Sequence, residues 1–344
     1  MKNEILNRWS FEGPTFEELN SLALYSFKNE HELLKSIEQV QFFLTQDRTQ
    51  IEYLYQDIKL VSAYFLFYFP THITKFYHYW QKINISYQDI LSSLAWVDFG
   101  AGPGTYSWPL LQFAKKVHMI ERAPLMREQA DVVGKFLFKD IGELPYRIGG
   151  SFSGFSCEEN TGIFFGHSFN EFSGDTGNIS EFLKMHDWKA IILLEPGTKE
   201  TFQKILQLRD VLLSNSYSII YPCPSNAPCP MEGIDDWCHQ FLRLKFPADV
   251  ERMSQKLKIN RRDVANIFHV YVKNDLDMRT KRPPRIVGGV WEEKGKFEWL
   301  ECYAAAEQNQ INLKQLLKRK LSKDELERVG HLYPGDQLDF EQKK

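Results

Sequence analysis

The stretch VDFGAGPGT at residues 97–105 indicates the fold of this chain. An apolar run from Leu94 to Phe99 includes one acid, and three glycines follow at alternate positions before a segment with helical periodicity begins at Thr105. This order predicts a strand, a tight turn and a helix. Glycine adopts positive φ and lets the backbone approach a ligand closely, and a new helix offers unpaired N–H groups. We therefore expect a ligand-binding loop after the strand.

The loop has the spacing G-x-G-x-G, which differs from the G-x-G-x-x-G of dinucleotide-binding folds. It resembles the first motif of S-adenosylmethionine-dependent methyltransferases, in which the loop wraps the methionine part of the cofactor. The resemblance implies that Gly100, Gly102 and Gly104 cradle the cofactor and that Asp98 orients the loop and the methionine amine. The alternative is an ordinary glycine-rich turn.

A second acid lies at the end of the next predicted strand, Val117 to Glu121. An acid at this place can accept hydrogen bonds from ribose hydroxyls. Glu121 is therefore the predicted ribose ligand, and a surface carboxylate is the alternative.

The composition is that of a globular protein with a sizeable core. The chain has 344 residues, 43% hydrophobic and 25% charged, a length that favours two domains. No apolar run reaches the ~18 residues of a membrane span, and the N-terminus lacks the features of a signal or transit peptide. We expect a cytoplasmic protein without membrane contact, and nothing in the sequence implies an oligomer.

The net charge of −3 conceals an asymmetry along the chain. From Gln240 to the end there are 22 Lys and Arg against 16 Asp and Glu, whereas the preceding part is acidic. Such a division indicates nucleic-acid binding only weakly. A solvated mixed surface explains it equally well.

Residues 1–93 form a predicted N-terminal helical region. Apolar residues recur at helical spacing in four segments bounded by residues such as Pro14, Asn29 and Pro70. The segments are 16–28, 30–45, 51–67 and 72–81. Aromatic residues are dense between Tyr53 and Trp80, which favours a packed core over a base-stacking surface.

Residues 94–273 form a predicted α/β domain, a Rossmann-like methyltransferase core with a seven-stranded sheet. After the glycine loop, strands and helices alternate, which is typical of a parallel sheet with helical crossovers. The expected helices are 105–115, 124–138, 179–186 and 199–213, and the expected strands are 117–121, 146–152, 161–169, 190–194, 217–221 and 266–272. The last strand is expected to be antiparallel.

The strand at 161–169 ends in polar residues, where ligands bind in parallel sheets. His167, Ser168 and Asn170 are therefore candidate site residues, with helix capping or a hydrogen-bonded turn as the alternative. The preceding strand, which often supplies an adenine-binding acid in methyltransferases, has glycine and serine at its end and gives no such assignment.

Three of the five cysteines, Cys223, Cys229 and Cys238, fall in a proline-rich insertion at 222–246 with the spacing C-x5-C-x8-C. Thiolates are the ligands of zinc and iron–sulfur centres, which usually take four donors. Cys302 or His239 could be the fourth, and the spacing does not choose between the metals. The alternative is that the cysteines are small buried hydrophobic residues.

The C-terminal part, 274–344, is a predicted basic β/α extension. Residues 286–303 favour a β-hairpin that turns at Lys294-Gly295-Lys296, which places Cys302 on the returning strand. A basic segment follows at 311–320.

Taken together, these pieces resemble the methyltransferase-like ribosomal small-subunit assembly factors, whose best-known members are mitochondrial and which have bacterial relatives. The resemblance covers residues 94–338. It is carried by VDFGAGPGT at 97–105, LLEPGT at 193–198, the PCP…CP…WCH run at 222–239, FHVYV at 268–272, PRIVG at 284–288, Cys302 and YPGD at 333–336.

The resemblance implies S-adenosylmethionine binding, a [4Fe–4S] cluster on Cys223, Cys229, Cys238 and Cys302, and association with the small ribosomal subunit and its rRNA. The motif of nucleic-acid amino-methyltransferases, Asn or Asp before Pro-Pro-aromatic, is absent, because the matching strand end is HSFNEF. No catalytic residue follows from the sequence. Three hypotheses remain: an rRNA methyltransferase, a non-catalytic assembly factor that binds cofactor and cluster, and a small-molecule methyltransferase with a zinc site.

Overall fold

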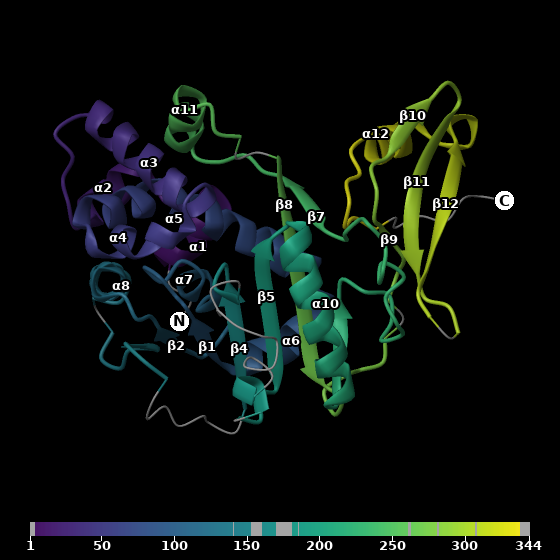
Figure 1. Cartoon of the computed structure of the whole chain (residues 1–344), viewed down its shortest axis with the longest axis horizontal. Helices are drawn as coiled ribbons and strands as arrows, with labels where there is room; N and C mark the ends of the chain where they lie inside the picture. The colour runs from purple at the N-terminus through teal and green to yellow at the C-terminus, as the bar shows by residue number, and fades with distance from the viewer. Residues whose placement is uncertain are drawn as a thin grey trace. The chain divides into compact units, whose positions relative to one another are not determined.

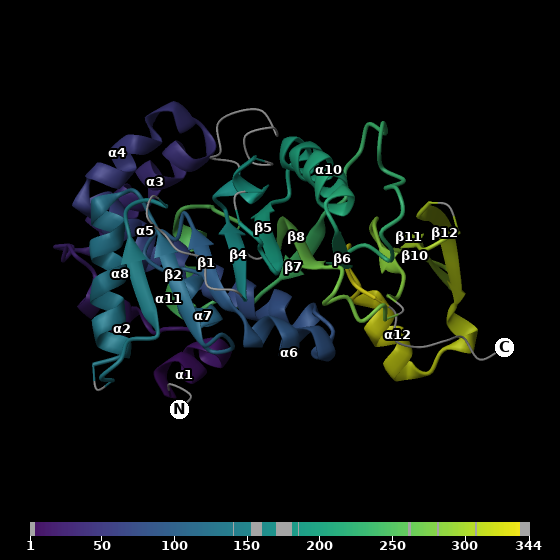
Figure 2. The ribbon, with the colours of Figure 1, turned by 90° about the horizontal axis from the view of Figure 1, so that it is seen from below.

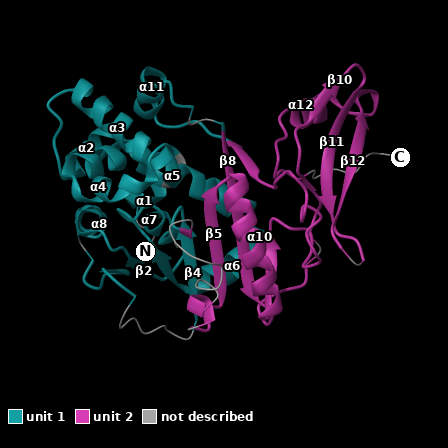
Figure 3. Ribbon diagram, viewed as in Figure 1, with its two compact units in different colours: residues 1–168, 243–263 teal, residues 169–242, 264–344 magenta. Residues whose placement is uncertain are grey.

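The computed structural model describes residues 4–139, 141–152, 160–169, 181–184, 186–260, 263–280, 282–306 and 308–337. The chain packs as two compact units (Figure 3), one of residues 1–168 and 243–263 and the other of residues 169–242 and 264–344. We call them unit 1 and unit 2. The domain boundaries at 93 and 273 stay predictions, as does the helix at 179–186, which lies partly outside the described residues.

Unit 1 begins with the predicted helical region (Figure 1). Its helices are α1 Glu4–Glu12, α2 Phe16–Leu22, α3 Glu30–Thr45, the 3-10 turn η1 Arg48–Gln50, α4 Ile51–Gln56, α5 Ile58–Lys82 and α6 Ile85–Ser93. Helix α3 has the predicted bounds, because Asn29 caps its first turn by accepting the N–H of Glu32 at 3.0 Å.

Helix α5 corrects the prediction that Pro70 separates two helices. It runs unbroken from Ile58 to Lys82 with Pro70 buried inside it. Asp57 starts it instead, by accepting the N–H groups of Lys59 and Leu60. Proline in a helix interior sacrifices one hydrogen bond, and burial of almost every neighbouring side chain offsets that loss here. The buried aromatic residues of α5 confirm the core interpretation of the aromatic-rich segment.

Unit 1 also holds the first half of the α/β core. Its elements are β1 Ala95–Phe99, α7 Ser107–Leu110, β2 Lys116–Ile120, α8 Pro124–Leu137, β3 Tyr146–Gly149, β4 Thr161–Gly166 and α11 Ala248–Lys256. The strands follow the order β3-β2-β1-β4, and all are parallel. Strand β1 is therefore central, and Asp98 lies beside Met119 on β2 and Phe164 on β4. The helix predicted at 105–115 is wrong in length, since only the four-residue α7 forms there.

Unit 2 holds the remaining α/β strands. Its first elements are β5 Ala190–Pro196, α10 Lys199–Ser214, β6 Tyr217–Tyr221, β7 Gln240–Arg243 and β8 Asp263–Lys273. Strand β8 lies between β5 and β6 and is antiparallel to both, as predicted for the last strand. Strand β7 also pairs with β8 and was not predicted, so eight α/β strands occur among the described residues instead of seven.

A separate small sheet follows in unit 2, with a helix beside it (Figure 2). It consists of β9 Arg285–Ile286, β10 Trp291–Glu293, β11 Lys296–Tyr303 and β12 Gln310–Leu317, followed by η3 Lys318–Lys320 and α12 Lys323–Gly330. The β10–β11 pairing confirms the predicted hairpin and places Cys302 on the returning strand. Its own core includes Phe297, Trp299 and Val329.

The structure confirms the α/β Rossmann-like class. Across the described parts of the chain, no helix combines the length and apolarity needed to cross a bilayer.

Candidate functional site

The glycine loop joins β1 to α7 at the carboxyl end of the central strand. Gly100, Gly102 and Gly104 all have positive φ, at 72°, 55° and 78°. The N–H groups of Gly100 and Ala101 donate to the carbonyl of Ile120 at 2.8 and 3.1 Å. The loop is therefore fixed against the end of β2, where Glu121 follows.

The three glycines are required for different reasons. A Cβ on Gly100 would lie 2.5 Å from Cβ of Ser168, and one on Gly104 would lie 2.4 Å from the indole nitrogen of Trp108. At Gly102 the nearest atom would be Oγ1 of Thr105, 4.0 Å away. Gly102 thus faces open space, whereas the other two let the loop pack on the protein itself.

Two buried polar atoms beside the loop lack hydrogen-bond partners among the described residues. They are Oδ1 of Asp98 and Oγ1 of Thr105, on side chains that are 1% and 3% exposed. The other carboxylate oxygen of Asp98 accepts the hydroxyl of Ser107 at 2.6 Å. Buried polar groups normally have partners, so these two atoms suit a ligand that donates hydrogen bonds.

Glu121 links the glycine loop to β2. Its carboxylate accepts the N–H of Gly102 at 2.9 Å and that of Ala123 at 2.7 Å. Burial raises the pKa of Glu121 in spite of these two hydrogen bonds. A carboxylate can accept about four hydrogen bonds, so Glu121 has acceptor capacity beyond these two.

Burial raises the pKa of Asp98 to about 7, the hydroxyl of Ser107 opposes the rise, and the charge of Glu121 adds to it. The ordinary value, 3.8, applies to the unfolded chain. Between these values the folded chain holds a proton that the unfolded chain has released. The contribution of Asp98 to the free energy of unfolding therefore falls as the pH rises from about 4 to about 7 and is constant above that.

We expect Asp98→Asn to remove this part of the pH dependence. The free energy of unfolding of the variant minus that of the wild type should rise by a few kcal/mol between pH 4 and 7, since each pKa unit corresponds to about 1.4 kcal/mol. Urea unfolding of both proteins at four pH values measures the difference. A difference that stays constant over this range would show that Asp98 is charged in the folded state.

Ser168 and His167 follow β4 and lie next to the loop. The hydroxyl of Ser168 donates to the carbonyl of Phe99 at 2.5 Å, which holds the turn after β4 against the end of β1. His167 has φ of 59°, an uncommon conformation for a residue other than glycine. Asn170, the third candidate of this segment, lies outside the described residues.

His167 belongs to an aromatic and polar cluster that the sequence analysis missed. Its ring lies edge-on to that of His72 with centroids 4.5 Å apart, and His72 Nδ1 is 2.7 Å from the hydroxyl of Tyr106. The ring of Tyr106 stacks parallel to that of His167 at 6.1 Å. The cluster joins α5, the glycine loop and the end of β4, segments so distant in sequence that no local signal could reveal it.

The four predicted metal ligands all lie in unit 2. Cys223 and Cys229 lie in the loop after β6, Cys238 precedes β7, and Cys302 is on β11. Burial raises the pKa of Cys238 well above its ordinary value, and the charges of Cys223, Cys229 and Cys302 raise it further. Burial and the charges of Cys223 and Cys229 likewise raise the pKa of Cys302 to about 12. The structure therefore brings the late cysteine into electrostatic contact with the other three.

His239, the alternative fourth ligand, makes other contacts. Its ring lies 5.5 Å from that of Trp237 and 5.3 Å from that of Phe241, and its Nδ1 lies 3.2 Å from the carbonyl of Trp237. Burial is the main cause that lowers the pKa of His239, and no cysteine contributes to the shift.

The metal site itself is not borne out as predicted. Within the described ranges, no group of three or more His, Cys, Asp or Glu side chains could hold a metal ion. A single zinc ion bound at about 2.3 Å requires sulfurs about 3.8 Å apart. A four-iron cluster separates its thiolates more widely, because the irons lie between them.

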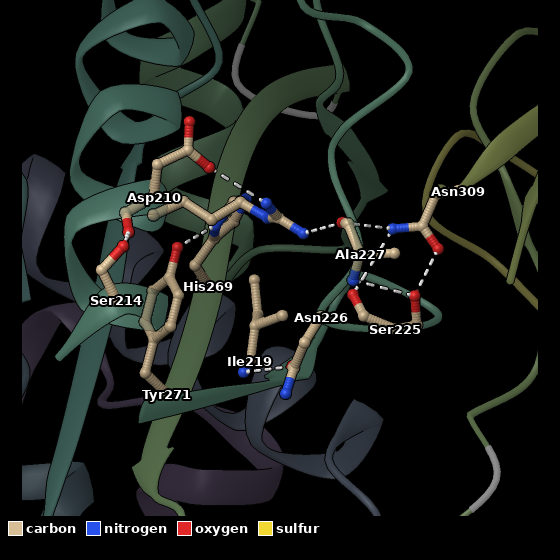
Figure 4. Close-up of polar contacts among 10 residues, drawn as sticks. Asp210, Ser214, Ile219, Ser225, Asn226, Ala227, His269, Tyr271 and Asn309 are labelled. Atoms are coloured by element: carbon tan, nitrogen blue, oxygen red, sulfur yellow. Dashed lines mark hydrogen bonds and ion pairs between the residues drawn. The ribbon is translucent and has the colours of Figure 1, made fainter. Parts of the chain in front are cut away.

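The loop that carries Cys223 and Cys229 is fixed by Asn309, which is 1% exposed (Figure 4). Its amide donates to the carbonyl of Ala227 at 3.0 Å, and its Oδ1 accepts the hydroxyl of Ser225 at 2.8 Å. The backbone N–H of Ile219 donates to the side chain of Asn226 at 3.1 Å. These contacts hold the two cysteines in a defined position.

A parallel β3-β2-β1-β4 sheet, with a glycine loop after β1 and an acid after β2, defines an α/β protein with a Rossmann-like fold. The family model described as "Mitochondrial small ribosomal subunit Rsm22" matches residues 59–321, and the chain belongs to this family. The resemblance inferred from the sequence is thereby confirmed. The family description names a mitochondrial ribosomal subunit, and the cytoplasmic location of this protein stays a prediction.

Solved structures show distant likenesses to this chain. No curated protein matches the chain. A magnesium protoporphyrin IX methyltransferase from Synechocystis, solved with bound SAH, is 12% identical, with 69% of this chain and 99% of that chain covered and a TM-score of 0.38. The YcgJ protein from Bacillus subtilis is 13% identical, with 53% and 92% covered and a TM-score of 0.33. These low scores carry no argument about function.

Proposed function

We propose that this protein binds S-adenosylmethionine at the glycine loop and acts on or with the RNA of the small ribosomal subunit. The partner follows from the family, whose description names that subunit. The main observation in favour of cofactor binding is the buried Oδ1 of Asp98. This atom has no hydrogen-bond partner among the described residues and lies beside a loop that is open at Gly102.

The residues of the loop fit the parts of this cofactor. Asp98 would accept hydrogen bonds from the ammonium group of the methionine part, and Glu121 would accept them from the ribose hydroxyls. Gly102 would leave room for the carbon chain of the methionine part. When bound, the cofactor would supply a methyl group on a positively charged sulfur. The chain's own contribution would be to hold that methyl group in line with an acceptor, because positioning alone can supply much of the acceleration.

We further propose a [4Fe–4S] cluster on Cys223, Cys229, Cys238 and Cys302, with zinc as the alternative. One observation supports the cluster: Cys238 and Cys302 each have a pKa that is raised by the charges of the other cysteines, in addition to burial. The cluster would join the loop after β6 to the small C-terminal sheet within unit 2.

A non-catalytic assembly factor is the second candidate function. The strand end HSFNEF favours it, because this segment lacks the motif that amino-methyltransferases of nucleic acids use. In that case cofactor and cluster would stabilise the fold, and the basic C-terminal part would contact rRNA phosphates.

Transfer of labelled methyl groups to small-subunit particles separates the two functions. A methyltransferase should place label in the rRNA, and Gly102→Ala should not. A wild-type protein that binds the cofactor but transfers no label to particles at any stage of assembly would instead be the assembly factor.

A further inference from the structure

The carboxyl group of Asp98 is bound to the protein on one side only. The side chain is 1% exposed, and its Oδ2 accepts the hydroxyl of Ser107 at 2.6 Å. Its Oδ1 is buried and has no hydrogen-bond partner among the described residues. A buried carboxylate without a positive partner is costly. In the free protein the neutral form of this carboxyl group is therefore favoured.

A second buried acid adds to this effect. Glu121 follows β2 and is fixed to the same loop, because its carboxylate accepts the N–H of Gly102 at 2.9 Å. Burial and the charge of Glu121 raise the pKa of Asp98 to about 7, although the hydroxyl of Ser107 opposes the rise. Two interacting carboxyl groups avoid being charged together. The charge of Asp98 therefore depends on what else binds at the loop.

The cations beside the loop have partners other than Asp98. Arg122 pairs with Glu52 on α4, and Nη1 of Arg127 donates to the carbonyls of Glu121 and Arg122 at 2.8 and 2.6 Å. The charges of both arginines lower the pKa of Glu121, and neither contributes to the shift at Asp98. Across the described ranges, no cation forms an ion pair with Asp98.

The histidines on the neighbouring elements do not set the charge of Asp98 either. His118 on β2 pairs with the residue before Asp98, so it faces the opposite side of the sheet. His72 on α5 has its Nδ1 2.7 Å from the hydroxyl of Tyr106, and the ring of His167, after β4, stacks on the same tyrosine. None of the three contributes to the pKa of Asp98.

The second buried atom without a described partner extends the subsite. Oγ1 of Thr105, on a side chain that is 3% exposed, lies 4.0 Å from the Cβ position of Gly102, on the open side of the loop. A hydroxyl can donate to a carboxylate, whereas Oδ1 of a charged Asp98 can accept from an ammonium group. The two atoms match the two ends of an α-amino acid.

We propose that Asp98 makes this loop specific for ligands that carry an α-ammonium group, and that such a ligand expels the proton of Asp98 when it binds. The inference rests on the proposed cofactor. The ammonium group supplies the positive charge that the described protein does not place there. The proton passes from Asp98 to solvent, the ammonium group keeps its own protons, and no covalent bond to the ligand forms. A nucleoside that lacks the amino acid binds without this release.

Two ligands that share adenine and ribose test this role in the wild-type protein. S-adenosylhomocysteine carries the amino acid, and 5′-methylthioadenosine does not. In titration calorimetry we expect S-adenosylhomocysteine to bind about eightfold more weakly at pH 6 than at pH 7.5, as follows for a group with a pKa near 7 that must lose its proton. The ratio of the two affinities should fall by the same factor, because titration of Glu121 affects both ligands equally.

The released proton can be counted directly. Titrations at pH 6 in two buffers of different ionisation enthalpy should show about 0.9 proton released for each S-adenosylhomocysteine bound. Asp98→Asn should bind this ligand more weakly and release no proton. Thr105→Val, which is nearly isosteric, should weaken binding about tenfold and leave the release unchanged, because it removes only a hydrogen bond to a charged group.

Each failure points to a different part of the account. Wild-type protein that binds S-adenosylhomocysteine equally at both pH values and releases no proton would overturn this inference and leave the proposed function standing. Wild-type affinity in Thr105→Val would overturn the role of the hydroxyl. A wild-type protein that does not bind S-adenosylhomocysteine at either pH would contradict the proposed cofactor site itself. If Asp98→Asn binds too weakly to measure, the wild-type proton count decides.

Discussion

Replacing Gly102 with alanine is expected to weaken S-adenosylmethionine binding at least about tenfold, or about 1.4 kcal/mol, while the protein stays folded. The added Cβ would enter the open space above the loop, since its nearest neighbour would be Thr105 Oγ1 at 4.0 Å. Titration calorimetry of the wild type and the variant gives the two affinities.

Gly233→Ala is the matched control for this experiment. Gly233 also has positive φ, at 73°, and nothing lies within 4 Å of its Cβ position. Both variants carry a similar backbone strain, so their melting temperatures should fall by similar amounts, and only Gly102→Ala should lose affinity. Unchanged affinity in Gly102→Ala would mean that the space above the loop does not receive the cofactor.

Replacing Cys229 with serine is expected to remove the proposed iron–sulfur centre and destabilise unit 2. Serine is a poor ligand for iron, and the free energy of binding a structural metal centre contributes directly to folding. Anaerobically purified Cys229→Ser should be colourless, contain little iron and sulfide, and be poorly soluble.

Cys157→Ser is the control for the cysteine experiment, because Cys157 is not among the proposed ligands. It should keep the colour and the iron content of the wild type. A brown Cys229→Ser protein with wild-type stability would contradict the assignment of this cysteine, and a wild-type protein that contains zinc instead of iron would favour the alternative metal.

The features that the sequence predicted well are local ones. The alternating glycines after Asp98 favour positive φ, so the loop could be placed from spacing alone. The helix predicted at 199–213 matches α10, which Thr198 caps by accepting the N–H of Thr201. Pro70 shows the limit of such rules. Its effect on α5 depends on how deeply the helix is buried, which no local pattern records.

The features that were missed depend on contacts between distant segments. Arg285 lies in the quoted PRIVG segment, but its contacts with Pro222 and Gly335 appear only in the folded chain. Arg209, which is buried on α10, has no local signal at all, because a single arginine on a helix is usually exposed. The grouping of Cys302 with the other cysteines came from the family resemblance and not from spacing.

The most direct test of the account is a crystal structure of the protein with S-adenosylhomocysteine. We predict that the ligand lies over Gly102, with its amine within hydrogen-bond distance of Asp98 Oδ1 and its ribose hydroxyls on Glu121. A ligand bound elsewhere, or crystals that take up none at saturating concentration, would contradict the proposed site.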